Sequence, residues 1–167
     1  MKSKKFTMGL LIFYLIVLTW IIIFKLQFSF ENLPHIRNIN LIPFGESVII
    51  NGKMDFGEII QNALAFIPFG VLMHVLWEEK PLIKQMAPVV AVSLLYEIIQ
   101  FLFAVGATDI TDVIANSLGG MIGIIIAVFI SKLSAKHWIK IINIVSISCA
   151  IVLTALDRKS TRLNSSH

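Results

Sequence analysis

Five long apolar runs, separated by short polar stretches, account for most of this chain of 167 residues. A helix that crosses a bilayer needs about 20 predominantly apolar residues, and each run has about this length. The pattern predicts an all-α membrane protein, a small polytopic helical bundle of about five transmembrane helices. The predicted helices cover residues 6–24, 58–77, 82–105, 109–131 and 138–156.

Composition leads to the same class of protein. The chain is 57% hydrophobic and 14% charged, and a soluble domain could not cover its surface with so few charges. Five closely spaced helices leave no room for a separate soluble domain. We therefore expect a single transmembrane domain over residues 1–156, with a long outer loop at 25–57. The polar tail at 157–167 lacks apolar periodicity, and we expect that it does not belong to the fold.

The basic residues predict the orientation of the helices. The net charge is +4, but the lysines lie in clusters between apolar runs, which argues for loop asymmetry and against a nucleic-acid partner. The clusters are Lys2, Lys4 and Lys5, then Lys80 and Lys84, then Lys132, Lys136 and Lys140. By the positive-inside rule, the N-terminus is cytoplasmic. The polar residues of the second, third and fourth helices then share the outer membrane face.

The fourth apolar run opens with a polar stripe. Asp109, Asp112, Asn116, Gly119 and Gly123 are spaced three, four, three and four, so a helix places them on one side. Helix capping could explain Asp109 and could also explain Asp112, because acids suit the positive end of the helix dipole. The glycine pair allows a neighbouring helix to approach closely. Asn116 lies a further turn inside, so we expect a functional or bundle-interior polar cluster here.

The third run carries a second polar face, which consists of Ser93, Glu97 and Gln100. A charged group near the middle of a membrane helix costs about 2.5–3.5 kcal/mol, so such residues usually face protein or water. Glu97 could serve a site, or it could be protonated and hydrogen-bonded to Gln100 or to a residue of the fourth helix. Because only a short turn joins these two helices, their polar faces can meet.

The second run contains a proline, Pro68, which should kink the helix because it removes a backbone hydrogen bond. Asn62 lies about a turn and a half before the kink. This break either lines a cavity or is structural, with Asn62 hydrogen-bonded to a neighbouring helix. His74 lies toward the cytoplasmic end, and we interpret it as an interfacial residue.

The first loop holds "NINLIPFGES", with Asn40 and Pro43 as its candidate residues. Its Ile-Pro-Phe-Gly sequence recurs around Pro68, and we interpret the two as independent proline breaks. The apolar character of residues 40–50 predicts a re-entrant or surface-lying segment.

The motifs of soluble enzymes are missing from the sequence: it has no phosphate-binding glycine loop, serine elbow or paired histidine motif. Two aspartates and a glutamate could hold a hard cation, but spacing alone gives this weak support, so we expect no metal and no cofactor. The candidate ligand-binding residues are Asn40, Asn62, Glu97, Gln100, Asp109, Asp112 and Asn116. The candidate structural residues are Pro43, Pro68, Gly119 and Gly123. If the protein is an enzyme, the candidate catalytic residues are Glu97, Asp109 and Asp112.

The order of these motifs resembles VanZ-like membrane proteins. The resemblance rests on "NLIPF" in the first loop, "N-x5-PFG" in the second run and "EIIQ" in the third. Its most specific part is "D-I-x-D-x-x-x-N-x-L-G-G-x-x-G" over residues 109–123. Many relatives carry an arginine just before the first aspartate. This chain has "VGATD" there, which leaves any charge pairing from that position in doubt.

The resemblance implies a role in teicoplanin-type glycopeptide resistance, or in the wider envelope response, at the cell membrane of a Gram-positive-type bacterium. We expect a non-enzymatic, multi-pass protein that contacts membrane lipid. At the outer leaflet it would bind an amphipathic envelope ligand, either a lipoglycopeptide or a lipid-linked cell-wall precursor. The alternatives are an intramembrane enzyme that acts on a lipid or lipid-linked precursor, and an assembly subunit whose polar cluster only holds helices together.

Overall fold

Four long helices make up most of the computed structural model, which describes residues 4–23, 39–44, 49–50, 53–54, 56–104, 108–133 and 144. They are α1 (Lys4–Ile23), α2 (Gly57–Trp77), α3 (Leu82–Phe103) and α4 (Ile110–Leu133). All four are long and apolar enough to cross a membrane. Their ends lie within two residues of the first four predicted helices. Apart from Ile144, the predicted fifth helix lies outside the described residues, as does the tail at 157–167.

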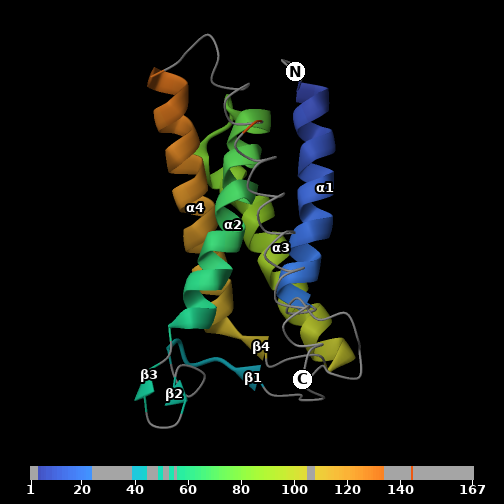
Figure 1. Cartoon of the computed structure of the whole chain (residues 1–167), viewed down its shortest axis with the longest axis vertical. Helices are drawn as coiled ribbons and strands as arrows, with labels where there is room; N and C mark the ends of the chain where they lie inside the picture. The colour runs from blue at the N-terminus through green and yellow to red at the C-terminus, as the bar shows by residue number, and fades with distance from the viewer. Residues whose placement is uncertain are drawn as a thin grey trace, which may run out of the picture.

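Four two-residue strands, which the sequence pattern did not predict, lie at one end of the bundle (Figure 1). They are β1 (Ile39–Asn40), β2 (Ile49–Ile50), β3 (Lys53–Met54) and β4 (Thr108–Asp109). β2 pairs with β3 in an antiparallel hairpin. β1 pairs with β4 in parallel, and this pairing places part of the first loop beside the start of α4.

Helix α2 is the central helix of the described bundle. More than half of its most apolar window, 56%, is buried, whereas the other three helices bury between 28% and 44%. α1 and α4 lie on opposite sides of α2, and α3 packs behind it (Figure 1). α2 and α4 both begin at the end that carries the strands, so they run in the same direction.

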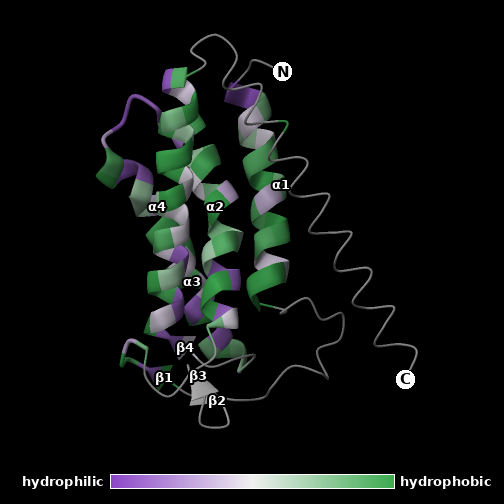
Figure 2. Ribbon diagram, turned by 60° about the vertical axis from the view of Figure 1, so that its left-hand side comes forward, coloured by the Kyte–Doolittle hydropathy of each residue, from purple (hydrophilic) through white to green (hydrophobic). Residues whose placement is uncertain are grey.

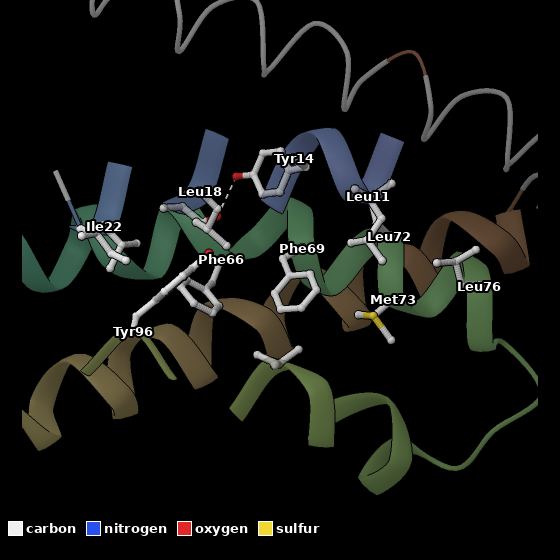
Figure 3. Close-up of a cluster of buried hydrophobic side chains, with 13 residues drawn as sticks. Leu11, Tyr14, Leu18, Ile22, Phe66, Phe69, Leu72, Met73, Leu76 and Tyr96 are labelled. Carbon is white, nitrogen blue, oxygen red and sulfur yellow. Dashed lines mark hydrogen bonds between the residues drawn. The ribbon is translucent and has the colours of Figure 1, made fainter. Parts of the chain in front are cut away.

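Helix α1 packs on α2 through an apolar cluster with one polar contact (Figure 3). Leu18, Phe66 and Phe69 are almost completely buried there. The hydroxyl of Tyr14 donates a 2.7 Å hydrogen bond to the backbone oxygen of Ala65. A buried tyrosine hydroxyl needs such a partner, and the bond therefore fixes the position of α1 along α2.

Helix α4 packs on α2 through a row of small buried residues at every fourth position. The row consists of Ala115, Gly119, Gly123 and Ala127. A Cβ atom on Gly119 would collide with the backbone oxygen of Ala63, and one on Gly123 with that of Ile67. Lipid tails are as apolar as the side chains, so close backbone packing of this kind stabilises helix pairs in membranes.

The outer surface of the four helices is apolar along most of its length. Large side chains are exposed on every helix, for example Ile16, Leu64, Ile98 and Phe129. In Figure 2 the hydrophilic segments gather at the two ends of the bundle and between the helices near the strands. This distribution is that of a membrane protein, because exposed apolar surface of this extent requires lipid around it.

Candidate functional site

The polar face of α3 points into the bundle. Ser93, Glu97 and Gln100 are all buried, and Glu97 is only 4% exposed. Their spacing of four and three residues places them on one side of the helix, as the sequence predicted. The same side also carries Tyr96, whose hydroxyl lies 3.0 Å from Oγ1 of Thr19 on α1.

Asn116 links this face to α4. Its side chain is completely buried, and its Nδ2 donates a 2.9 Å hydrogen bond to Oγ of Ser93. The polar faces of α3 and α4 therefore meet. Asn116 lies about two turns inside the helix, too deep to cap it.

Asp109 connects three elements and is 5% exposed. Its backbone N–H donates to Oε2 of Glu97 at 2.9 Å. Its Oδ1 accepts the N–H of Thr111 at 2.8 Å, which caps the first turn of α4. Its Oδ2 accepts Nδ2 of Asn40 at 3.2 Å. One partner of Glu97 is thus the backbone N–H of Asp109, just before α4. Asp109 caps α4 and also lies beside the buried face of α3.

The first loop docks on the start of α4. Beyond the contact of Asn40 with Asp109, the N–H of Phe44 donates to Oγ1 of Thr111 at 3.1 Å. The φ angle of Phe44 is 58°, a conformation that bulky residues adopt only when surrounding contacts hold it. Pro43 lies in this loop and is exposed. Together with β1 pairing to β4, these contacts bring Asn40 to the site across 69 positions of the chain.

Gln100 turns toward α1. Its Nε2 donates a 3.2 Å hydrogen bond to the backbone oxygen of Ile22. A backbone oxygen is only an acceptor, so the amide must present its NH₂ group to it. We use the term polar cluster for Ser93, Glu97, Gln100, Asp109 and Asn116.

Two oxygen atoms of the polar cluster are buried acceptors. Oε1 of Gln100 and Oδ1 of Asn116 have no hydrogen-bond partner among the residues that the structure describes. A buried polar atom without a partner costs about 1–3 kcal/mol, so such atoms are uncommon unless they serve a function. Within the same described part of the chain, no group of three His, Cys, Asp or Glu side chains could hold a metal ion.

Two further predicted residues lie at this end of the bundle. Asn62, in the first half of α2, and Asp112, in the first turn of α4, are both half-buried. The hydrogen bonds described above do not include either side chain. Pro68 lies inside α2, which continues through it to Trp77.

A separate polar pair lies at the opposite end of the bundle. His74 is buried, not interfacial as its position in the sequence suggested. Its Nδ1 lies 2.9 Å from Oε1 of Gln85, whose Nε2 donates to the backbone oxygen of Lys80. This pair stabilises the turn between α2 and α3 and is remote from the polar cluster.

Four further hydrogen-bonding residues were not predicted from the sequence. The backbone N–H of Thr111 donates to Asp109 of the cluster, and the hydroxyls of Tyr14, Thr19 and Tyr96 join α1 to α2 and α3. The position of Thr111 between two aspartates was a usable signal, because threonine side chains often bond to nearby backbone groups. The tyrosines lie in apolar runs, where the sequence does not distinguish a buried hydroxyl from one near lipid head groups.

Comparison with known proteins identifies the family. The model of the VanZ/LLP1 family matches residues 11–131. Protein VanZ of Enterococcus faecium is 39% identical over 165 residues, which covers 97% of this chain and 98% of that protein. No solved structure matches the chain. The match includes all four described helices and the polar cluster, and the chain therefore belongs to the VanZ/LLP1 family.

Proposed function

We propose that this protein protects a Gram-positive-type bacterium against teicoplanin-type glycopeptides, or acts in the wider envelope response, by binding an amphipathic envelope ligand. It would be a multi-pass protein of the cell membrane, with the ligand taken from the outer leaflet. Membership of the VanZ/LLP1 family supports the class of function. The polar cluster supports the mechanism.

The charges of the described residues support an orientation with the N-terminus in the cytoplasm. The end where α1 begins carries the basic residues Lys4, Lys5, Lys80, Lys84 and Lys132 and the acidic residues Glu78 and Glu79. The end with the strands carries the basic residue Lys53 and the acidic residues Glu58, Glu97, Asp109 and Asp112. Lysine-rich ends of membrane helices usually face the cytoplasm. The polar cluster then lies near the outer membrane face.

The observation that carries the proposal is the burial of Gln100 and Asn116 next to Glu97. Capping accounts for Asp109, whereas Gln100 and Asn116 lie inside their helices and each keeps an acceptor oxygen without a described partner. Polar side chains are costly in the membrane interior and usually mark a functional site there. Binding is favoured over catalysis, because Glu97 and Asp109 already accept hydrogen bonds from the backbone.

The experiment that tests this function is a teicoplanin susceptibility assay in a sensitive Gram-positive host, with vancomycin as the comparison drug. We expect the wild-type chain to raise resistance to teicoplanin. Asn116→Ala and Asp112→Ala should abolish this protection at unchanged membrane levels. Gln61→Ala, which changes an exposed side chain at the same end, is the matched control and should protect fully. If Asn116→Ala and Asp112→Ala both protect as well as wild type, the site assignment is wrong.

An Asp112→Asn variant separates binding from catalysis. Asparagine keeps an acceptor oxygen of similar shape but cannot take up a proton. Partial protection by Asp112→Asn supports binding, and loss as complete as in Asp112→Ala supports proton transfer and the enzyme alternative.

A further inference from the structure

The short segment at residues 39–44 carries large apolar side chains that the described bundle leaves uncovered. Leu41 and Ile42 are 71% and 70% exposed, and Ile39 and Phe44 are about half exposed. The segment contains no charged residue. It lies outside the four helices, so the lipid that surrounds the helices does not by itself account for these side chains.

Contacts with β4 and α4 fix the height of this segment along the bundle. β1 runs parallel to β4, with Asn40 opposite Asp109, the residue just before α4. The backbone N–H of Phe44 donates to Oγ1 of Thr111, the second residue of α4. α4 has 24 residues and is therefore about 36 Å long, a little more than the hydrocarbon core of about 30 Å. When α4 crosses a bilayer, its first turn lies close to the boundary between head groups and acyl chains, and the segment lies beside that turn.

The backbone donors at positions 42–44 need no water. The N–H of Ile42 donates to Oδ1 of Asn40 at 3.1 Å, Pro43 has no N–H, and the N–H of Phe44 donates to Thr111. Lipid tails offer no hydrogen-bond partner, so a segment that contacts them must satisfy its donors within the protein. The amide group of Asn40 also turns inward, toward Asp109. These polar groups bond to the protein, and the apolar side chains are left for the surroundings.

We propose that Leu41, Ile42 and Phe44 insert into the lipid leaflet at the strand end of the bundle and anchor the first loop there. Their partner is the boundary between head groups and acyl chains, which surface-lying segments enter by about 5–10 Å. The sequence left a re-entrant and a surface-lying segment open. The bond of Phe44 to the first turn of α4 favours the surface-lying form. The inference is independent of the proposed ligand, because it does not require the polar cluster to be a site.

The test is the accessibility of spin labels on the full chain in vesicles of phosphatidylcholine and phosphatidylglycerol. A nitroxide is attached to Leu41→Cys or to Ile42→Cys, each in a Cys149→Ala background. Oxygen dissolves preferentially in lipid and a nickel chelate stays in water, so the collision rates with the two reagents report the surroundings of the label. Leu95→Cys, on the exposed side of α3, is the lipid control. Glu79→Cys, in the exposed turn after α2, is the water control.

We expect the labels at both loop positions to collide more with oxygen than with the nickel chelate, as the label at Leu95 does, and the label at Glu79 to show the reverse. Both loop side chains are exposed, so the substitutions should not disturb folding, and size-exclusion chromatography checks this. Either variant alone suffices for the test. Preference for the nickel chelate, as at Glu79, would place the segment in water and overturn the inference. Protection from both reagents would show that a second copy or another protein covers the segment, and would also overturn it.

Discussion

Asp109 shows how one residue can hold a site together. Its backbone N–H, Oδ1 and Oδ2 bond respectively to Glu97 of α3, Thr111 of α4 and Asn40 of β1. Each of the three partners belongs to a different element, so this carboxylate is one of the contacts that hold the first loop at the start of α4. The residue is therefore both a helix cap and a joint between segments.

Two substitutions at Asp109 separate these roles. Asp109→Ala removes the cap and the bond to Asn40, and should cost about 1–2 kcal/mol. Asp109→Asn keeps a capping oxygen but opposes the amide of Asn40 with a second amide, so its cost should be intermediate. Thermal unfolding in detergent, followed by size-exclusion chromatography, should rank wild type above Asp109→Asn and Asp109→Ala last. An Asp109→Ala protein as stable as wild type would contradict the assigned contacts.

The bond between Ser93 and Asn116 can be measured directly. In membranes such side-chain bonds contribute about 0.6 kcal/mol on average and at most about 1.7. A double-mutant cycle with Ser93→Ala, Asn116→Ala and the double variant should give a coupling energy in this range. Additive effects of the two single variants on the free energy of unfolding would show that the two side chains do not interact.

At the scale of the elements, α4 serves two neighbours at once. Its row of small residues packs against α2, and Asn116, on another side of the same helix, bonds to α3. The close approach to α2 fixes the depth of α4 in the bundle. It therefore also fixes the height at which Asn116 meets Ser93, so packing in one interface positions the polar contact in the other.

A pair of glycine variants tests this packing. Gly123→Leu should clash with the backbone of α2 near Ile67 and Val71 and destabilise the protein by about 1–3 kcal/mol or more. Gly9→Leu, on α1, is the matched control, because nothing lies within 4 Å of a Cβ atom there. Melting temperatures of the two purified variants decide the matter. Equal temperatures for both would refute the tight contact between α2 and α4.

At the scale of the whole molecule, the described helices have two chemically different ends. One end carries most of the lysines and the buried pair of His74 and Gln85. The other carries the carboxylates, the amides and an apolar loop in which Leu41 and Ile42 are 71% and 70% exposed. Such exposed apolar side chains are expected for a segment that lies at the membrane surface.

Periodicity could predict the helices and the polar face of α3, because both repeat at helical spacing. It could not predict that Gln100 would bond to Ile22 of α1, because periodicity shows which face of a helix is polar but not which helix packs against that face. The pairing of β1 with β4 was also inaccessible, because it joins two residues to two others across 69 positions and has no composition signal. The polar stripe in α4 predicted that Asn116 would lie in the bundle interior. It did not predict that Gly119 and Gly123 would pack on α2 while Asn116 bonds to α3.

The central claim is that the polar cluster lies at the outer face of the membrane. The most direct measurement is maleimide labelling of Glu58→Cys and Glu79→Cys, two exposed glutamates at opposite ends of the bundle, in a Cys149→Ala background. With a membrane-impermeant reagent on intact cells, we expect Glu58→Cys to be labelled and Glu79→Cys to be labelled only after permeabilisation. The reverse pattern would place the polar cluster in the cytoplasm and contradict the account.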